Sequence, residues 1–203
     1  MRRTRGLLPA LSAVLLLCAA WRDARACACC TSVGERTDLV MKFESYYSDE
    51  IQRLRFSATA QLFLGEADPE SVKGIATPSE RYDLQAHWKN DRMLFSFRDQ
   101  ANHSGTLAIA RPRTISIFHV DPRDDPPPPP SRGPVLYKEW RLSSPASGTG
   151  IFAPGLSQGQ TLTLVLQGRG NNCTSAADFS HWMLVMWGPK TKYRFFGDLV
   201  TTR

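Results

Sequence analysis

Four of the five cysteines carry the most reactive chemistry in this sequence; the fifth, Cys18, lies in an apolar run near the start. Cys27, Cys29 and Cys30 lie within four consecutive positions, and Cys173 stands alone in the C-terminal half. Thiols at this density can form disulfides, or they can bind a soft metal such as Cu(I) or zinc. The compartment decides between the two, because disulfides persist where the surroundings are oxidising. The segment before the cysteines therefore matters first.

The first 26 residues have the three parts of a secretory signal peptide. Arginines near the start form a positive region, residues 7–20 form an apolar run, and Ala-Arg-Ala at 24–26 matches a small-x-small cleavage site. Trp-Arg-Asp at 21–23 ends the run before it reaches the roughly 20 apolar residues that a membrane span needs. The sequence predicts a signal peptide over residues 1–26 and a secreted or periplasmic protein without a transmembrane segment in its mature chain.

In an oxidising compartment, the four cysteines of the mature chain favour two disulfides. Every connectivity joins Cys173 to one of the N-terminal cysteines. A bridge between the adjacent Cys29 and Cys30 is sterically awkward, so we expect Cys173 to bond to one of these two. Such a bridge closes a loop of roughly 145 residues and can stabilise the fold by about 4–5 kcal/mol. The alternative is a soft-metal site at Cys27, Cys29 and Cys30, with His181 and Met183 as candidate further ligands.

The charge of the mature chain gives no indication of nucleic-acid binding. The whole sequence has 25 basic and 19 acidic residues and a net charge of +6. Residues 1–26 contain five arginines and one aspartate, so 20 basic and 18 acidic residues remain, a net charge of +2. No cluster of Lys and Arg forms a stripe that could follow a phosphate backbone. A nucleic-acid partner is not expected.

The elements that must position these residues are strands. In residues 53–65, apolar side chains recur at every second position from Leu54 to Leu64, as in a half-buried strand. Further strands are expected at residues 105–110, 114–120, 135–142, 160–167, 181–187 and 192–199. Together with a hairpin over 81–99, they predict an all-β protein: a single antiparallel domain of about eight or nine strands, either an up-and-down barrel or a sandwich.

The hairpin register predicted from the turn can be checked against the pattern of apolar residues in its two strands. Asn90 and Asp91 tolerate the left-handed conformation that a two-residue turn requires. Pairing the residues on either side of this turn predicts one shared apolar face, because opposite residues point the same way. The expected pairs are Lys89 with Arg92, Trp88 with Met93, Ala86 with Phe95 and Leu84 with Phe97.

Other segments interrupt the strand pattern. A Cys-rich N-terminal segment at 27–52 precedes the β domain at 53–203, and residues 45–54 predict a short helix capped by Ser45 or Ser48. The Pro-rich loop at 121–134 contains five consecutive prolines, which favour polyproline II and cannot join a sheet ladder. We expect a stiff loop there, with a docking site for a partner as the alternative. Turns are expected at 147–150 and at 167–173, the second presenting Cys173.

No catalytic or cofactor-binding motif is present in the sequence. It has no G-x-S-x-G, no H-E-x-x-H, no Walker loop and no calcium loop. The four histidines show no spacing typical of metal ligands. No cofactor is expected, and the pattern favours a binding or structural protein over an enzyme.

Aromatic residues of the expected strands supply the candidates for a ligand cavity. If the sheet closes, inward rings can line a space for a small apolar ligand, although such rings more often only fill the core. We expect an exported, disulfide-stapled β domain that binds a ligand or has a structural role. The alternative is extracytoplasmic handling of copper or zinc by the N-terminal cysteines. The cavity candidates are Trp88, Phe95, Phe97, Trp140 and Trp182.

Overall fold

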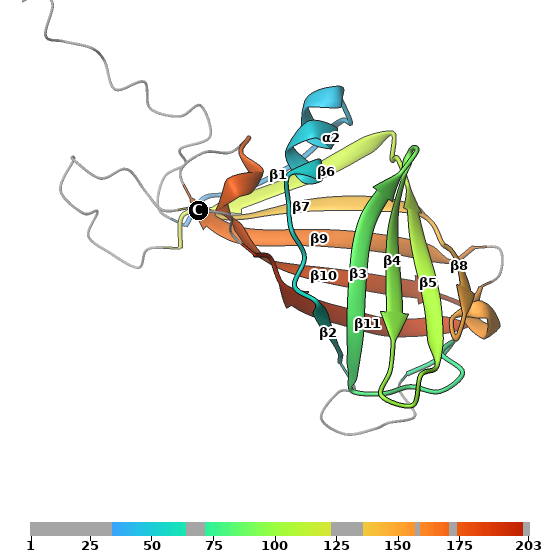
Figure 1. The fold of residues 1–203 in the computed structure, drawn as a ribbon. Coiled ribbons are helices and arrows are strands. Elements are labelled where there is room, and N and C mark those ends of the chain that lie inside the picture. Colours follow the sequence, from blue (N-terminus) through green and yellow to red (C-terminus); the bar gives the residue numbers. More distant parts are fainter. Residues whose placement is uncertain (1–33, 64–71, 123–135, 157–158, 171–173, 201–203) are drawn as a thin grey trace, which may run out of the picture.

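One antiparallel sheet makes up most of the protein. The computed structural model describes residues 34–63, 72–122, 136–156, 159–170 and 174–200. Within these residues, eleven strands lie in the order β1-β6-β7-β9-β10-β11-β2-β3-β4-β5-β8 (Figure 1). The strands are β1 (Arg36–Lys42), β2 (Thr59–Leu62), β3 (Arg81–Lys89), β4 (Arg92–Arg98), β5 (Ser104–Ala110), β6 (Thr114–Val120), β7 (Leu136–Pro145), β8 (Ser147–Gly150), β9 (Thr161–Gly170), β10 (Phe179–Gly188) and β11 (Thr191–Asp198). The all-β, antiparallel fold class is confirmed.

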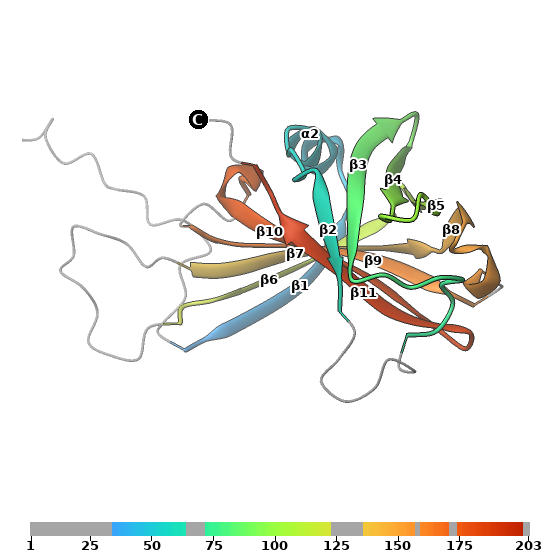
Figure 2. The same cartoon turned by 60° about the horizontal axis from the view of Figure 1, so that its bottom comes forward.

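The sheet curls over itself but does not close into a barrel. Its two edges are β1 and β8, and all neighbouring strands are antiparallel. The half that contains β3, β4 and β5 folds across the half that contains β7, β9 and β10, so that β5 also approaches β7 and β9 (Figures 1 and 2). The helix α2 (Ser45–Gln52) lies at one end of this curl. In the described part of the chain, no helix is long and apolar enough to cross a membrane.

The predicted hairpin is confirmed residue by residue. β3 and β4 pair Lys89 with Arg92, and the three apolar pairs that follow are the predicted ones. Asn90 in the two-residue turn has φ 54°, the left-handed conformation that asparagine tolerates better than most residues. Local sequence therefore determines this part of the sheet.

The expected turn at 147–150 is wrong, and so is the described part of the turn at 167–173, whose residues 171–173 lie outside the described residues. Glycines explain both differences. Residues 147–150 form the edge strand β8. This is possible because Gly148 has no Cβ, which would clash with the Thr106 carbonyl oxygen of β5. Glycine thus lets β8 approach β5. β9 likewise continues to Gly170 instead of turning at residue 167, since Gly168 leaves room for the Asp178 backbone. Glycine marks close approach of two backbones here.

The first predicted strand is shorter than its alternation suggests. Of its described residues, 53–63, only Thr59–Leu62 form β2, and Phe56 contributes an isolated bridge to Leu199. β1 was not predicted as a strand. It lies in the segment 27–52, and five of its last six side chains are exposed, so it lacks the alternation that marks a half-buried strand.

The core lies inside the curl and is rich in aromatic rings. Tyr82, Phe97, Phe152, Tyr193 and Phe195 pack mainly edge to face, at centroid distances between 4.4 and 6.0 Å. Such geometry is favourable beyond the area that the rings bury. Tyr82 and Phe97 come from β3 and β4, and Tyr193 and Phe195 come from the middle strand β11, so these contacts hold β3 and β4 against the middle of the sheet.

Candidate functional site

The helix α2 closes one end of the curl through its buried face. Tyr47 and Ile51 point inward, and the Tyr47 ring meets Trp140 of β7 edge to face at 5.2 Å. The expected cap is wrong: the N-cap residue is Glu44, and none of the described side chains caps the helix. Packing against the sheet therefore stabilises this short helix, as is usual for helices below about 12–15 residues.

Glu50 joins α2 to the turn before β10. Its side chain is largely buried; Oε1 accepts a hydrogen bond from Arg53 Nη1 at 2.5 Å, and Oε2 accepts one from the Ala176 backbone N–H at 2.8 Å. Ala176 begins the short 3-10 helix η3 (Ala176–Asp178). A carboxylate of the helix thus holds the turn 126 residues away in sequence.

Lys138 holds the same turn from the sheet. Its side chain is 2% exposed, and Nζ donates to the Ser175 carbonyl oxygen and to Asp178 Oδ2, each at 2.8 Å. The ammonium group also lies 5.0 Å from the centroid of the Phe179 ring. Sequence reasoning missed this residue, although the signal was present: Lys138 shares the inward face of β7 with Leu136 and Trp140. A lysine in an apolar row indicates a buried partner.

Two pockets flank the chain segment that leads from α2 to β2. The first, of about 370 Å³, lies between α2 and η3 and includes Tyr46, Glu50 and Phe179 in its wall. The second, of about 390 Å³, lies between residues 52–56 and the β3–β4 hairpin. Leu54 contributes to both.

The second pocket has mainly apolar walls, and Trp88 is one of the residues that line it. The indole Nε1 of Trp88 is buried and has no hydrogen-bond partner among the described residues. An N–H of this kind costs free energy until an acceptor reaches it. The apolar residues of the wall are Leu54, Phe56, Ala86, Trp88 and Met93, and the polar ones are Gln52, Arg55 and His87.

The five cavity candidates are divided between this pocket and the core. Trp88 lines the pocket. Phe95, Phe97, Trp140 and Trp182 are at most 1% exposed and pack against other rings, and Phe97 also borders a polar groove. Phe56, which the sequence analysis did not single out, connects the two regions, since its ring contacts both Phe95 and Trp182.

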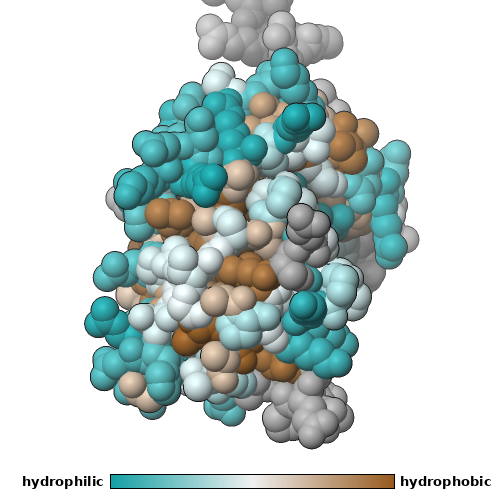
Figure 3. Space-filling view, turned by 90° about the vertical axis from the view of Figure 1, so that its right-hand side faces the viewer, coloured by the Kyte–Doolittle hydropathy of each residue, from teal (hydrophilic) through white to brown (hydrophobic). Residues whose placement is uncertain are grey.

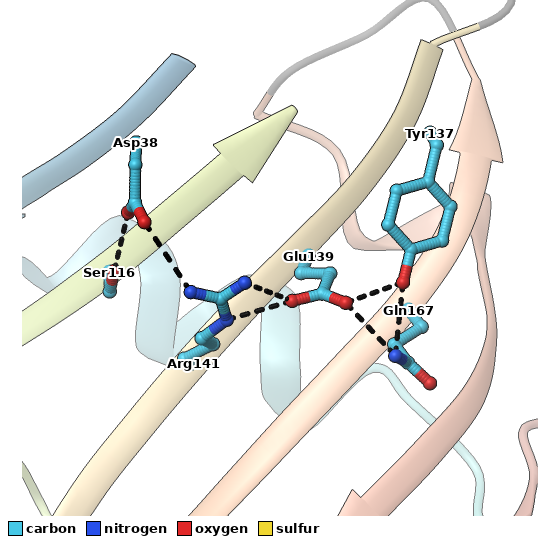
Figure 4. A network of polar contacts seen from close by, with 6 residues as sticks. All are labelled: Asp38, Ser116, Tyr137, Glu139, Arg141 and Gln167. Atoms are coloured by element: carbon cyan, nitrogen blue, oxygen red, sulfur yellow. Dashed lines mark hydrogen bonds and ion pairs between the residues drawn. The ribbon is translucent and has the colours of Figure 1, made fainter. Parts of the chain in front are cut away.

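A polar network covers the outer face of the sheet beside β1. The carboxylate of Glu139 accepts hydrogen bonds from Tyr137 at 2.5 Å, from Gln167 at 3.0 Å and from Arg141 at 2.7 Å (Figure 4). Burial alone would raise the pKa of Glu139, but these donors outweigh it and lower that pKa. Burial and the neighbouring carboxylate raise the pKa of Tyr137 to about 12.

The same network reaches the edge strand. Arg141 Nη1 lies 3.5 Å from Asp38 Oδ2, and Ser116 donates to Asp38 Oδ1 at 3.0 Å (Figure 4). Each carboxylate in the network already has donors, so the arrangement fixes strands to one another. It ties β1 to β6 and β7.

The cysteines and the Pro-rich loop lie almost wholly outside the described residues. Cys27, Cys29, Cys30, Cys173 and residues 123–135 are not described. Among the residues that are described, no three His, Cys, Asp or Glu side chains gather as metal ligands would. His103 pairs with Asp99, and His181 pairs with Asp198, each at 2.9 Å.

Comparison with protein-family models, with curated proteins and with solved structures finds no match for this chain. The function proposed for this protein therefore rests on the geometry of the described residues.

Proposed function

We propose that this protein is an exported, disulfide-stapled β domain that binds a small, mainly apolar ligand in the pocket beside Trp88. Trp88 carries the proposal, because its side chain lines the pocket and its buried indole N–H lacks an acceptor among the described residues. A ligand with one oxygen acceptor and an apolar body would cover the apolar wall, and a small turn of the indole towards the pocket would let that ligand satisfy the donor.

The size and position of the pocket support this proposal. Its volume of about 390 Å³ lies within the range of small-molecule sites, about 300–1,000 Å³. It opens at the end of the curl, where the chain from Gln52 to Phe56 crosses the β3–β4 hairpin. The mouths of closed β-barrels are frequent ligand sites, and the end of this curled sheet resembles such a mouth.

The test uses the fluorescent ketone 6-propionyl-2-(dimethylamino)naphthalene, which combines an apolar body with one carbonyl acceptor. We expect saturable binding with a shift of its emission to shorter wavelength. Trp88→Phe keeps an aromatic ring but removes the donor, so it should weaken binding about fivefold, the effect of one hydrogen bond worth about 1 kcal/mol. Fluorescence titration measures both dissociation constants.

Trp187→Phe is the matched control, because Trp187 is 61% exposed and does not contribute to this pocket. It should bind the ketone like the unchanged protein. Absence of saturable binding, or equal affinity of the Trp88→Phe protein, would contradict the proposal.

The proposed export and disulfides rest on the N-terminal pattern and on the even number of cysteines in residues 27–203. We expect the intact mass of the exported protein to correspond to a start at Cys27, less four hydrogens for two disulfides. Alkylation without a reductant should add no mass. Reactive thiols together with a copper- or zinc-sized adduct in the native spectrum would instead support metal handling by the three N-terminal cysteines.

A further inference from the structure

The two edge strands of the sheet differ in their capacity to pair with a strand of another molecule. β8 has four residues, two of them glycines, and so short an edge strand is one way in which proteins avoid such pairing. Figure 3 shows the face that carries β8, where apolar and weakly polar surface fills the middle and hydrophilic side chains lie towards the rim. β1 has seven residues and, among the described strands, pairs with β6 alone. β1 is therefore the edge that can accept a further strand.

The backbone direction along β1 follows from its register. The Phe43 N–H donates to the Arg113 carbonyl oxygen at 2.9 Å, in line with the β1–β6 pairing. Backbone groups alternate in direction along a strand of an antiparallel sheet. Residues 37, 39 and 41 thus direct their backbone groups towards β6, and residues 38, 40 and 42 direct theirs outward.

The outward edge is also apolar at its centre. Leu39, Val40 and Met41 are 48%, 73% and 44% exposed. Val40 lies on the outer face of the sheet with Asp38 and Lys42, while Leu39 and Met41 lie on the inner face opposite Ile117 and Ile115 of β6. An exposed run of three large apolar residues is unusual on an edge that no described strand covers, since edges normally carry charges or proline.

We propose that β1 pairs antiparallel with β1 of a second copy of this chain, with Val40 opposite Val40 of that copy. This register joins two outward-directed hydrogen-bonding positions and continues the sheet across the two-fold axis. It places Asp38 opposite Lys42, Leu39 opposite Met41, and Arg36 opposite Glu44, where the chain is still extended. Each pair occurs twice in the dimer.

Charge selects this register over its neighbours. One β1 strand can shift along the other only by an even number of residues, because only then do the outward-directed backbone groups of both copies still meet. A shift of two residues in one direction places Arg36 opposite Lys42, and a shift of four residues places Asp38 opposite Asp38 of the other copy. A shift of two residues in the opposite direction places Asp38 opposite Glu44. Like charges directly opposite each other destabilise strand pairs, and opposite charges stabilise them.

Side-chain contacts within one copy also fix the position of β1. Asp38 accepts from Ser116 and lies 3.5 Å from Arg141, so β1 is tied to β6 and β7 through side chains as well as backbone. A rigid edge loses less conformational entropy on pairing. The inference concerns a different surface from the proposed ligand pocket and does not depend on it.

Sedimentation equilibrium of the purified protein, with any signal peptide removed by the expression host, tests the dimer. We expect a monomer–dimer equilibrium in the micromolar range. Val40→Pro removes the outward N–H without touching the β1–β6 ladder, so it should give a folded monomer. Val40→Thr keeps both the N–H and the branched side chain and should still dimerise. A monomeric unchanged protein, or a dimeric Val40→Pro protein, would overturn the proposal.

Exchanging the charges at positions 38 and 42 tests the register. This test does not depend on whether the Val40→Pro protein folds. Lys42→Glu places like charges opposite each other in its own dimer, and so does Asp38→Lys. Each variant alone should dimerise several-fold more weakly than the unchanged protein. Mixing the two variants restores both opposite-charge pairs, so heterodimers should form. If the mixture associates no better than either variant alone, the Val40-centred register is wrong.

Discussion

Trp140→Ala is expected to lower the free energy of unfolding by about 4 kcal/mol, a typical loss for a buried tryptophan. Trp140 is fully buried on β7, and its indole lies against Tyr47 of α2 at 5.2 Å and Phe179 of β10 at 5.0 Å. Its removal leaves a cavity where the helix meets the sheet. Urea denaturation followed by circular dichroism measures the loss, and the midpoint of thermal unfolding should fall by about 10 °C.

Two further variants keep this prediction testable if the alanine protein does not fold. Trp140→Phe should cost clearly less, because the indole N–H has no partner among the described residues and its loss breaks no described hydrogen bond. Trp187→Ala should change stability by less than about 0.5 kcal/mol, since Trp187 is 61% exposed. Equal stability of the Trp140→Ala and Trp187→Ala proteins would contradict the buried position of Trp140.

Asp178→Ala is the second large effect, and we expect it to cost about 3 kcal/mol. The substitution removes the carboxylate that lies 2.8 Å from the Lys138 ammonium, while that ammonium stays in a side chain that is 2% exposed. A buried charge that loses an ion-pair partner is destabilising, because the interior solvates it poorly. Urea denaturation at neutral pH measures the change.

The comparison with Lys138→Met distinguishes two effects: leaving the Lys138 ammonium without the Asp178 carboxylate, and losing the ion pair as such. Methionine has a similar length and suits the apolar row of Leu136 and Trp140. The carboxylate left behind on Asp178 is 28% exposed and can be hydrated. Lys138→Met should therefore destabilise less than Asp178→Ala, and the reverse order would show that the ion pair is not what holds η3.

The local features of the fold could be predicted from neighbouring residues. The hairpin register from Leu84 to Phe97 follows from two-residue periodicity and from a turn that tolerates φ 54° at Asn90. The strands β5, β6, β7, β9, β10 and β11 follow from the same periodicity. β1 and β8 could not be predicted in this way, because an exposed edge and a glycine-rich edge lack the alternating burial on which the prediction depends.

The candidate site could be predicted only in part. Trp88 was identified as an inward aromatic residue, and it does line the pocket beside the hairpin. Its role as an unpartnered donor, and the contribution of Leu54 and Phe56 to the wall, depend on how the chain after α2 crosses β3 and β4. That crossing is set by packing between segments far apart in sequence.

The sequence by itself determined the all-β class, the hairpin register and most of the strands, because alternation of apolar residues and turn preferences act between near neighbours. Only the tertiary structure decided that the sheet curls without closing, that Lys138 is buried against Asp178, and that β1 is left as an apolar edge. These features arise where Lys138 of β7 meets Asp178 of η3, where β5 approaches β7 and β9, and where β6 pairs with β1. They depend on which distant segments pack together, and that choice is made by the free energy of the whole core rather than by any local pattern.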